Sequence, residues 1–191
     1  MKALEEKIKA EGRVLKGNIL DVGGFLNQLI DPAFTIEMAE EVKRLFAKSG
    51  VTKILTMESS GIAIGFAVAA VFNVPLVFAK KRKALNQDGK MLTASVHSYT
   101  HNSDYTATVS ADYINENDTV LIVDDFLANG EAMRGLIKII RSADADLAGC
   151  VVQIEKGFQH GGDKLRAEGI RVEALALIDS MSYEEGLKFR N

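Results

Sequence analysis

Short apolar runs alternate with amphipathic segments along most of the 191-residue chain, and this alternation constrains the fold more than any other feature. The apolar runs are predicted to be strands, because they are continuous and are bounded by glycine, proline or polar residues. They cover residues 51–57, 75–79, 119–123, 147–154 and 171–178. Strands that are apolar on both faces are typical of a parallel sheet between helices. The sequence therefore predicts an α/β fold with a mostly parallel sheet flanked by helices.

The intervening segments carry helical periodicity or none. Helices are predicted over residues 2–11, 35–49, 62–72, 131–142 and 162–168. Residues 15–32 are predicted to be irregular, because they contain several glycines and the turn signal Asp31-Pro32. Residues 80–106 are basic at first, then polar, then β-like over residues 93–99. We expect a long mobile loop flanked by strands there, and such loops are usually functional.

Composition excludes several classes of function. The net charge of −3 provides no overall basic field for nucleic acid. The single cysteine, Cys150, cannot form an internal disulfide and is expected to be a small buried side chain. No apolar stretch resembles a signal peptide or reaches membrane-spanning length, which predicts a cytoplasmic protein without a membrane partner. No linker divides the chain, so residues 1–191 are expected to form a single domain.

One strand leads into a turn that combines acids with small residues. Residues 120–132 read VLIVDDFLANGEA, so an apolar strand delivers Asp124 and Asp125 to its carboxyl end, where ligands bind in open α/β sheets. The turn opens into a helix, whose first N–H groups and dipole favour a phosphate. Carboxylates beside a phosphate can accept hydrogen bonds from sugar hydroxyls. The segment therefore favours a ribose phosphate; the alternative is a plain strand end that caps a helix.

The complete thirteen-residue pattern resembles the motif with which type I phosphoribosyltransferases bind 5-phosphoribosyl-1-pyrophosphate (PRPP). The resemblance implies that fold, with a small hood over the base, and Mg²⁺ that is held through PRPP rather than by a dedicated set of protein ligands. It implies catalytic roles for Asp124 and Asp125, which can also approach the ion. The implied PRPP-binding residues of the turn are Ala128, Asn129, Gly130, Glu131 and Ala132.

A second strand–helix turn offers another anion site. Glu58, Ser59, Ser60 and Gly61 follow a strand and open a helix, so their N–H groups can hold an anion. This turn resembles the pyrophosphate loop of the family, which often holds a strained or cis peptide. Lys80 and Lys81 correspond to the basic position of the family, and the segment after them corresponds to its mobile lid. An ordinary turn and a solvated basic edge are the alternatives.

Three other segments suggest the base. Residues 20–32 (LDVGGFLNQLIDP), 155–159 (EKGFQ) and 171–178 (RVEALALI) resemble bacterial xanthine phosphoribosyltransferases. The resemblance implies a hood from residues 12–34 and 155–180 over a purine, in an enzyme of purine salvage. It also implies that Leu20 and Asn27 contact xanthine, that Lys156 binds an exocyclic oxygen, and that residues 128–132 hold the 5′-phosphate.

The chemistry of these residues suits xanthine. Asn27 offers a donor and an acceptor to a base edge, and Lys156 offers three donors and a positive charge to an oxo group. Xanthine loses a proton more readily than other common purines, so a lysine favours its anion. Phe158 can stack on the ring. The alternatives are that Phe158 belongs to the core, that Asn27 satisfies a turn, and that Lys156 lies on the surface.

The sequence also departs from related patterns. Hypoxanthine–guanine enzymes usually carry an aspartate where this chain has Ala128, which leaves no obvious general base; adenine enzymes also show alanine there. Gly157 and His160 differ from the serine and proline expected of xanthine enzymes. An adenine or guanine phosphoribosyltransferase is therefore the first alternative. The second is a non-catalytic PRPP-sensing regulator, although only about 34 residues precede the first core helix, too few for a winged-helix domain. The family implies a homodimer, in which the mobile loop can complete the neighbour's site.

Overall fold

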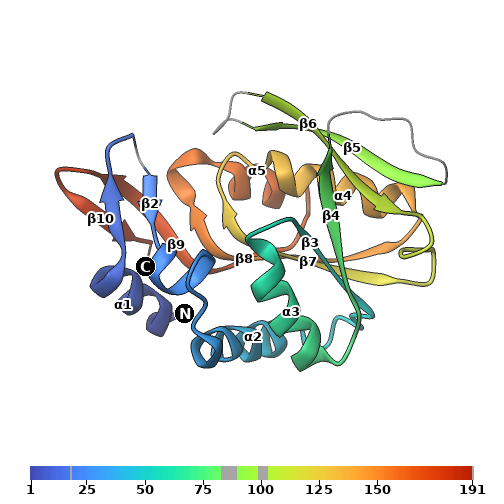
Figure 1. Cartoon of the computed structure of the whole chain (residues 1–191), viewed down its shortest axis with the longest axis horizontal. Helices are drawn as coiled ribbons and strands as arrows, with labels where there is room; N and C mark the ends of the chain where they lie inside the picture. Colours follow the sequence, from blue (N-terminus) through green and yellow to red (C-terminus); the bar gives the residue numbers. More distant parts are fainter. Residues whose placement is uncertain (18, 83–89, 99–102, 191) are drawn as a thin grey trace.

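The computed structural model describes residues 1–17, 19–82, 90–98 and 103–190. Its central feature is an eight-stranded sheet with the order β10-β9-β8-β7-β3-β4-β6-β5 (Figure 1). The strands are β3 (Lys53–Met57), β4 (Leu76–Arg82), β5 (Met91–Ser98), β6 (Ser103–Ser110), β7 (Thr119–Leu127), β8 (Asp146–Lys156), β9 (Val172–Ser182) and β10 (Gly186–Phe189). The five strands from β9 to β4 are parallel, and the antiparallel strands lie at the two ends. The predicted α/β fold with a mostly parallel sheet is confirmed.

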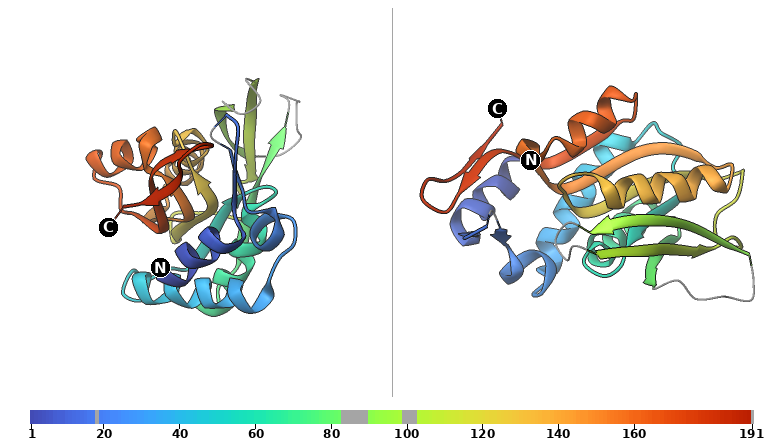
Figure 2. Two further views of the ribbon diagram at one scale, coloured as in Figure 1. Left: turned by 90° about the vertical axis from the view of Figure 1, so that its left-hand side faces the viewer. Right: turned by 90° about the horizontal axis from the view of Figure 1, so that it is seen from above.

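Helices cover both faces of this sheet (Figures 1 and 2). Helices α2 (Pro32–Phe46) and α3 (Gly61–Phe72) lie on one face, and α4 (Glu131–Ser142) and α5 (Gly161–Ala167) lie on the other. Alternate strand residues enter the two cores: Leu121 packs with α2 and α3, whereas its neighbours Val120 and Ile122 pack with α4. This double burial explains why the strands are continuously apolar. No helix in the described ranges has the length and apolar character needed to span a membrane.

After β3 and after β7, the chain continues to opposite sides of this strand pair. These strands are parallel neighbours. β3 leads through α3 to β4 on one side, whereas β7 leads through α4 to β8 on the other side and on the opposite face. Ligands of open α/β sheets bind in the crevice at such a switch point, beyond the carboxyl ends of the strands. The fold therefore marks the ends of β3 and β7 as the place for a site.

The N- and C-terminal segments lie together at one end of the sheet (Figure 1). Helix α1 (Lys2–Glu11) and the hairpin of β1 (Arg13–Leu15) and β2 (Ile19–Asp21) lie against β9, and the α-amino group of Met1 donates to the carbonyl of Leu175. A single π-helical turn, Gly23–Asn27, follows. The expectation that residues 15–32 are wholly irregular was therefore wrong, because two short strands and a helical turn lie there.

Residues 80–106 also differ from the expected loop. β4 continues to Arg82. β5 begins at Met91 and forms an antiparallel arm with β6. Ala94 and Val96 of this arm are buried against α4, where Gly135 makes room for the Val96 side chain. Most of the segment is thus a packed sheet extension. The part of the predicted loop in residues 83–89 and 99–102 lies outside the described residues.

Cys150 lies in the middle of β8 and is fully buried, as expected. Its neighbours across the sheet are Ile122 on β7 and Val172 on β9. This apolar environment raises the pKa of the Cys150 thiol to about 12, because burial disfavours the thiolate.

Candidate active site

The end of β7 and the start of α4 form the floor of a pocket. The strand ends at Leu127, residues 128–130 form a short loop, and α4 begins at Glu131. Gly130 adopts a φ of 91°, a left-handed conformation that costs glycine little, which lets the chain turn sharply into the helix. The pocket is lined by all five residues from 128 to 132. Free N–H groups at the start of a helix make this loop suited to a phosphate.

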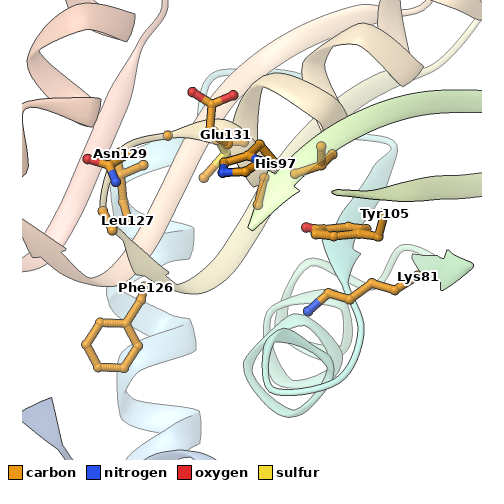
Figure 3. Close-up of a pocket in the computed structure, with 12 residues that line it drawn as sticks. Lys81, His97, Tyr105, Phe126, Leu127, Asn129 and Glu131 are labelled. Atoms are coloured by element: carbon orange, nitrogen blue, oxygen red, sulfur yellow. The ribbon is translucent and has the colours of Figure 1, made fainter. Parts of the chain in front are cut away.

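Three polar side chains from the neighbouring strands face this loop across the pocket. Lys81 of β4, His97 of β5 and Tyr105 of β6 all line the pocket. Figure 3 shows Lys81 and Tyr105 side by side, with Asn129 and Glu131 on the other side of the pocket. The Nζ atom of Lys81 lies 5.5 Å from the centroid of the Tyr105 ring. The pocket therefore combines a helix N-terminus with a cation, an arrangement that favours a phosphorylated ligand.

Asp124 and Asp125 lie within the last four residues of β7, and both are buried. The N–H group of Asp125 donates to Oδ1 of Asp124 at 3.0 Å. Burial raises the pKa of Asp124 well above its ordinary value, and the charge of Asp125 adds to this effect, while Lys81 opposes it. Two adjacent carboxyl groups are thus held in a site that has little water of its own. A ligand that brings hydroxyl groups or a cation would stabilise them there.

The turn after β3 meets this carboxyl pair. The peptide bond between Glu58 and Ser59 is cis, and α3 begins at Gly61. A Cβ atom on Gly61 would lie 2.7 Å from Oδ1 of Asp124 and 2.1 Å from Oγ1 of the buried Thr56. Only glycine fits, so the close approach of the two turns depends on this residue. The Glu58 carboxylate accepts a hydrogen bond from the N–H of Lys81, which links this turn to the lysine in the pocket.

The residues expected to contact a base lie toward the end of the sheet where the N- and C-terminal segments meet. Leu20 is buried in the hydrophobic core that α2 and α3 share, and Phe126 and Phe158 pack against the same core. The Nζ atom of Lys156 lies 5.7 Å from the centroid of the Phe126 ring. Burial lowers the pKa of Lys156, because the half-buried ammonium group is partly desolvated. Asn27 ends the π-helical turn and is half-buried.

Known proteins share both this sequence and this fold. A family model described as the phosphoribosyl transferase domain matches residues 28–168. The chain belongs to the phosphoribosyl transferase domain family. Xanthine phosphoribosyltransferase of Lachnoclostridium phytofermentans is 46% identical over 186 residues, which are 97% of this chain and 96% of that protein. The same enzyme of Heliobacterium modesticaldum is 49% identical over 181 residues, which are 95% of this chain and 96% of the relative.

Solved structures agree on the architecture. Adenine phosphoribosyltransferase from Rhodothermus marinus has a TM-score of 0.73 at 23% identity, over 93% of this chain and 99% of that one. The Giardia lamblia enzyme, solved with 9-deazaadenine, has a TM-score of 0.75 at 22% identity, over 91% and 96% of the two chains. At such low identity these structures establish the type I phosphoribosyltransferase fold alone.

The structure separates the two lysines that the family resemblance grouped together. Lys80 and Lys81 are consecutive in β4, so their side chains point to opposite faces of the sheet. Lys81 lines the pocket with the phosphoribosyltransferase loop, whereas Lys80 lines a surface hollow with Phe78 and Tyr113. Of these two lysines, Lys81 is the one that the structure places beside residues 128–132.

Three residues around the site were not predicted. His97 and Tyr105 line the pocket because the β5–β6 arm folds over α4, and Phe126 faces Lys156 from within the acid-pair motif. Phe126 was present in the motif as an aromatic residue directly after two acids, but strict alternation from Leu121 and Val123 would place it on the opposite face from the one that it takes. Nothing in the sequence placed His97 and Tyr105 beside the loop.

We expect Asp124→Asn to stabilise the ligand-free protein at neutral pH. A carboxyl group with a raised pKa binds its proton more tightly in the folded state, so its contribution to stability falls as pH rises from about 4 through the folded-state pKa. The variant removes the buried charge. Its stability gain should be present at pH 7–8 and should vanish below the ordinary aspartate pKa. Urea unfolding across this pH range, without PRPP or Mg²⁺, measures the difference.

The exposed Asp146 provides a matched control for the same substitution. Asp146→Asn should change stability little at any pH in the series. An Asp124→Asn protein no more stable than the wild type at pH 7–8 would contradict the assignment of a strained, buried charge to this position.

Proposed function

We propose that this chain transfers the 5-phosphoribosyl group of PRPP to xanthine, yielding xanthosine 5′-monophosphate and pyrophosphate in purine salvage. The observation that carries the proposal is the 46–49% identity, over nearly the whole chain, to proteins named xanthine phosphoribosyltransferase. The pocket of a phosphate loop and a cation, together with the two buried acids on the strand that leads to that loop, supports the PRPP half of the reaction. The half-buried Lys156 beside Phe126 supports the xanthine half.

PRPP has three groups to hold, and the site offers a partner for each. Residues 128–132 bind the 5′-phosphate through N–H groups at the start of α4. Asp124 and Asp125 accept hydrogen bonds from the ribose hydroxyls. The pyrophosphate lies over Glu58, Ser59, Ser60 and Gly61, at the start of α3, with Lys81 beside it. The meeting of both turns at Gly61 sets the distance between the two phosphate sites.

Xanthine lies under a hood formed by residues 12–34 and 155–180, within a single-domain protein. Leu20, Phe126 and Phe158 provide apolar contacts for the purine, and Asn27 reads a polar edge. Lys156 donates to an exocyclic oxygen. Burial partly removes water from the Lys156 ammonium group, which destabilises its charge. An anionic base beside it would stabilise that charge again.

Mg²⁺ accompanies PRPP in this proposal. PRPP would hold the ion, and Asp124 and Asp125 would offer carboxylate oxygens, the donors that it prefers. Within the described parts of the chain, no three His, Cys, Asp or Glu side chains are grouped to hold a metal, so PRPP and water would complete its shell. When bound, the ion would neutralise part of the charge on the pyrophosphate.

The chemistry is displacement at ribose C1, with positive charge developing on the sugar ring. The bond from C1 to pyrophosphate breaks as a base nitrogen attacks from the hood side. Lys81 and the N–H groups after β3 stabilise the departing negative charge, and the buried carboxylates orient the ribose. Ala128 cannot act as a base, so a deprotonated xanthine held by Lys156 removes the need for one.

A homodimer accompanies this function in the proposal. Three exposed aromatic side chains, Phe66, Phe78 and Tyr113, border two adjoining hollows that share Pro75 and Leu76. Exposed apolar surfaces of this kind are typical of protein interfaces. The two hollows lie at the α3–β4 connection, on the strand that carries Lys81 into the site. The cytoplasmic location expected from the sequence stays a prediction.

The first experiment measures pyrophosphate release from PRPP and Mg²⁺ with xanthine, guanine, hypoxanthine and adenine in separate reactions. Release with xanthine should far exceed release with the others, and Asp124→Asn and Asp125→Asn should abolish it while the fold is retained. Release with adenine or guanine instead would keep the reaction and overturn the choice of base. A protein that binds PRPP but releases nothing with any base would be the sensing regulator.

Lys156→Gln should selectively impair use of xanthine. Loss of one charged hydrogen bond lowers kcat/KM for xanthine by roughly 10- to 100-fold, while the KM for PRPP stays unchanged because the lysine lies on the base side. Steady-state kinetics with each substrate varied in turn measures the split. Lys138→Gln, on the exposed face of α4, is the control and should behave as wild type. Equal effects on both substrates would contradict the assignment.

Sedimentation velocity at micromolar concentration should give twice the mass of one chain. Phe66→Ser should shift this equilibrium toward the monomer, because the Phe66 side chain is two-thirds exposed in one protomer and its loss leaves the core intact. Ile36→Ser, on the exposed face of α2, is the matched control. A wild-type protein that sediments as a monomer would overturn the proposed dimer.

A further inference from the structure

Two glycines at the start of α5 lie directly behind the loop of residues 128–130. The N–H of Gly161 donates to the carbonyl of Ala128 at 3.1 Å. A Cβ atom on Gly161 would lie 2.2 Å from that carbonyl oxygen, 2.6 Å from the carbonyl carbon of Asn129 and 2.7 Å from the nitrogen of Gly130. These are backbone atoms, so the loop itself would have to move to admit any side chain at position 161.

The second glycine lies against an ion pair whose carboxylate is buried and whose guanidinium is partly exposed. A Cβ atom on Gly162 would lie 2.1 Å from Oε1 of Glu155. Glu155 is fully buried near the end of β8 and pairs in register with Leu127, the residue that precedes the loop. Its two carboxylate oxygens accept from the guanidinium of Arg166 on α5, one of them at 2.9 Å. The loop, the glycines and the ion pair therefore form one continuous set of contacts.

This ion pair is suited to fix the position of α5. The helix has seven residues, too few to be stable without tertiary contacts. Arg166 also donates from Nε to the carbonyl of Val172 at 3.1 Å, so its guanidinium ties α5 to the sheet at two strands. Removing one partner of a buried pair leaves an uncompensated charge, which makes this geometry costly to change.

A second tie between helices lies outside this set of contacts. Arg134 of α4 forms two hydrogen bonds with Glu168, at 2.9 and 2.6 Å, just beyond the end of α5. Both side chains are substantially exposed, so this pair contributes much less than a buried one. It has the same chemistry as the buried pair without contact to the loop, which makes it a matched control.

We propose that Gly161, Gly162, Glu155 and Arg166 are positioning residues that hold the loop of residues 128–130 in the shape that receives the 5′-phosphate. The inference rests on the proposed function only in assigning that phosphate to the loop. None of the four residues touches substrate. Their effect passes through backbone contact, and it should therefore be confined to ligands that carry the ribose phosphate.

Calorimetric titrations of the full-length chain with ribose 5-phosphate, and separately with Mg²⁺-pyrophosphate, test the proposal. Gly161→Ala is the main variant, because Gly161 does not adopt a left-handed backbone and alanine there adds only a steric contact. Arg166→Lys retains the charge but not the two-pronged geometry, and Arg166→Met removes both. Glu168→Gln is the control.

Gly161→Ala should weaken ribose 5-phosphate binding by at least about tenfold, because a displacement of the loop by a fraction of an ångström misaligns its N–H groups. Pyrophosphate binding should stay within about twofold of wild type, because a different turn holds it. Arg166→Lys should lie between wild type and Arg166→Met, and Glu168→Gln should match wild type. In turnover, the KM for PRPP should rise while the KM for xanthine does not.

Two results would overturn the proposal. One is unchanged ribose 5-phosphate affinity in Gly161→Ala. The other is an equal loss of affinity for both ligands, which would indicate a general effect on folding. A wild-type protein that binds neither ligand would instead refute the proposed function, and the inference with it.

Discussion

The structure depends on the divergence of two parallel neighbours, β3 and β7. One strand continues to a helix on one face and the other to a helix on the opposite face, and such a divergence forms a crevice at the carboxyl ends of the two strands. Both connections are tight, and both begin a helix directly. The start of α3 thereby lies against Asp124 near the end of β7, and α4 begins shortly after that strand. The proposed PRPP site spans these two turns.

The same geometry imposes a cost on the protein. Asp124 is buried, lies beside a second carboxylate, and is approached so closely by Gly61 that no side chain fits between them. The apolar cores on both faces of the sheet supply the stability that tolerates this. A buried carboxylate of this kind lowers stability, as is common where function opposes stability.

Much of the architecture was predictable from the sequence, because local and tertiary preferences agree there. The helix over residues 131–142 was predicted with the bounds observed, and the central strands were recognised from their apolar runs. Strand ends were predicted too short, since β7 continues through Asp124 and Asp125. The β-like character predicted over residues 93–99 corresponds to β5, whereas β6 was not given as a strand, because its polar, alternating sequence resembles a loop until it pairs with β5 and packs on α4. Pleat alternation places Lys80 and Lys81 on opposite faces of the sheet, a separation that a motif comparison does not reveal.

The single cysteine, Cys150, is buried, so it does not compete for reagents that modify thiols on the protein surface. The group reacts as a thiolate, and with a pKa of about 12 and no exposure it presents almost none at neutral pH. A cysteine introduced anywhere on the exterior can thus carry a spectroscopic probe without competition from the native chain. Conversely, a reagent can modify Cys150 only after the centre of the sheet has opened. The rate of that modification therefore measures how often the core of the protein unfolds.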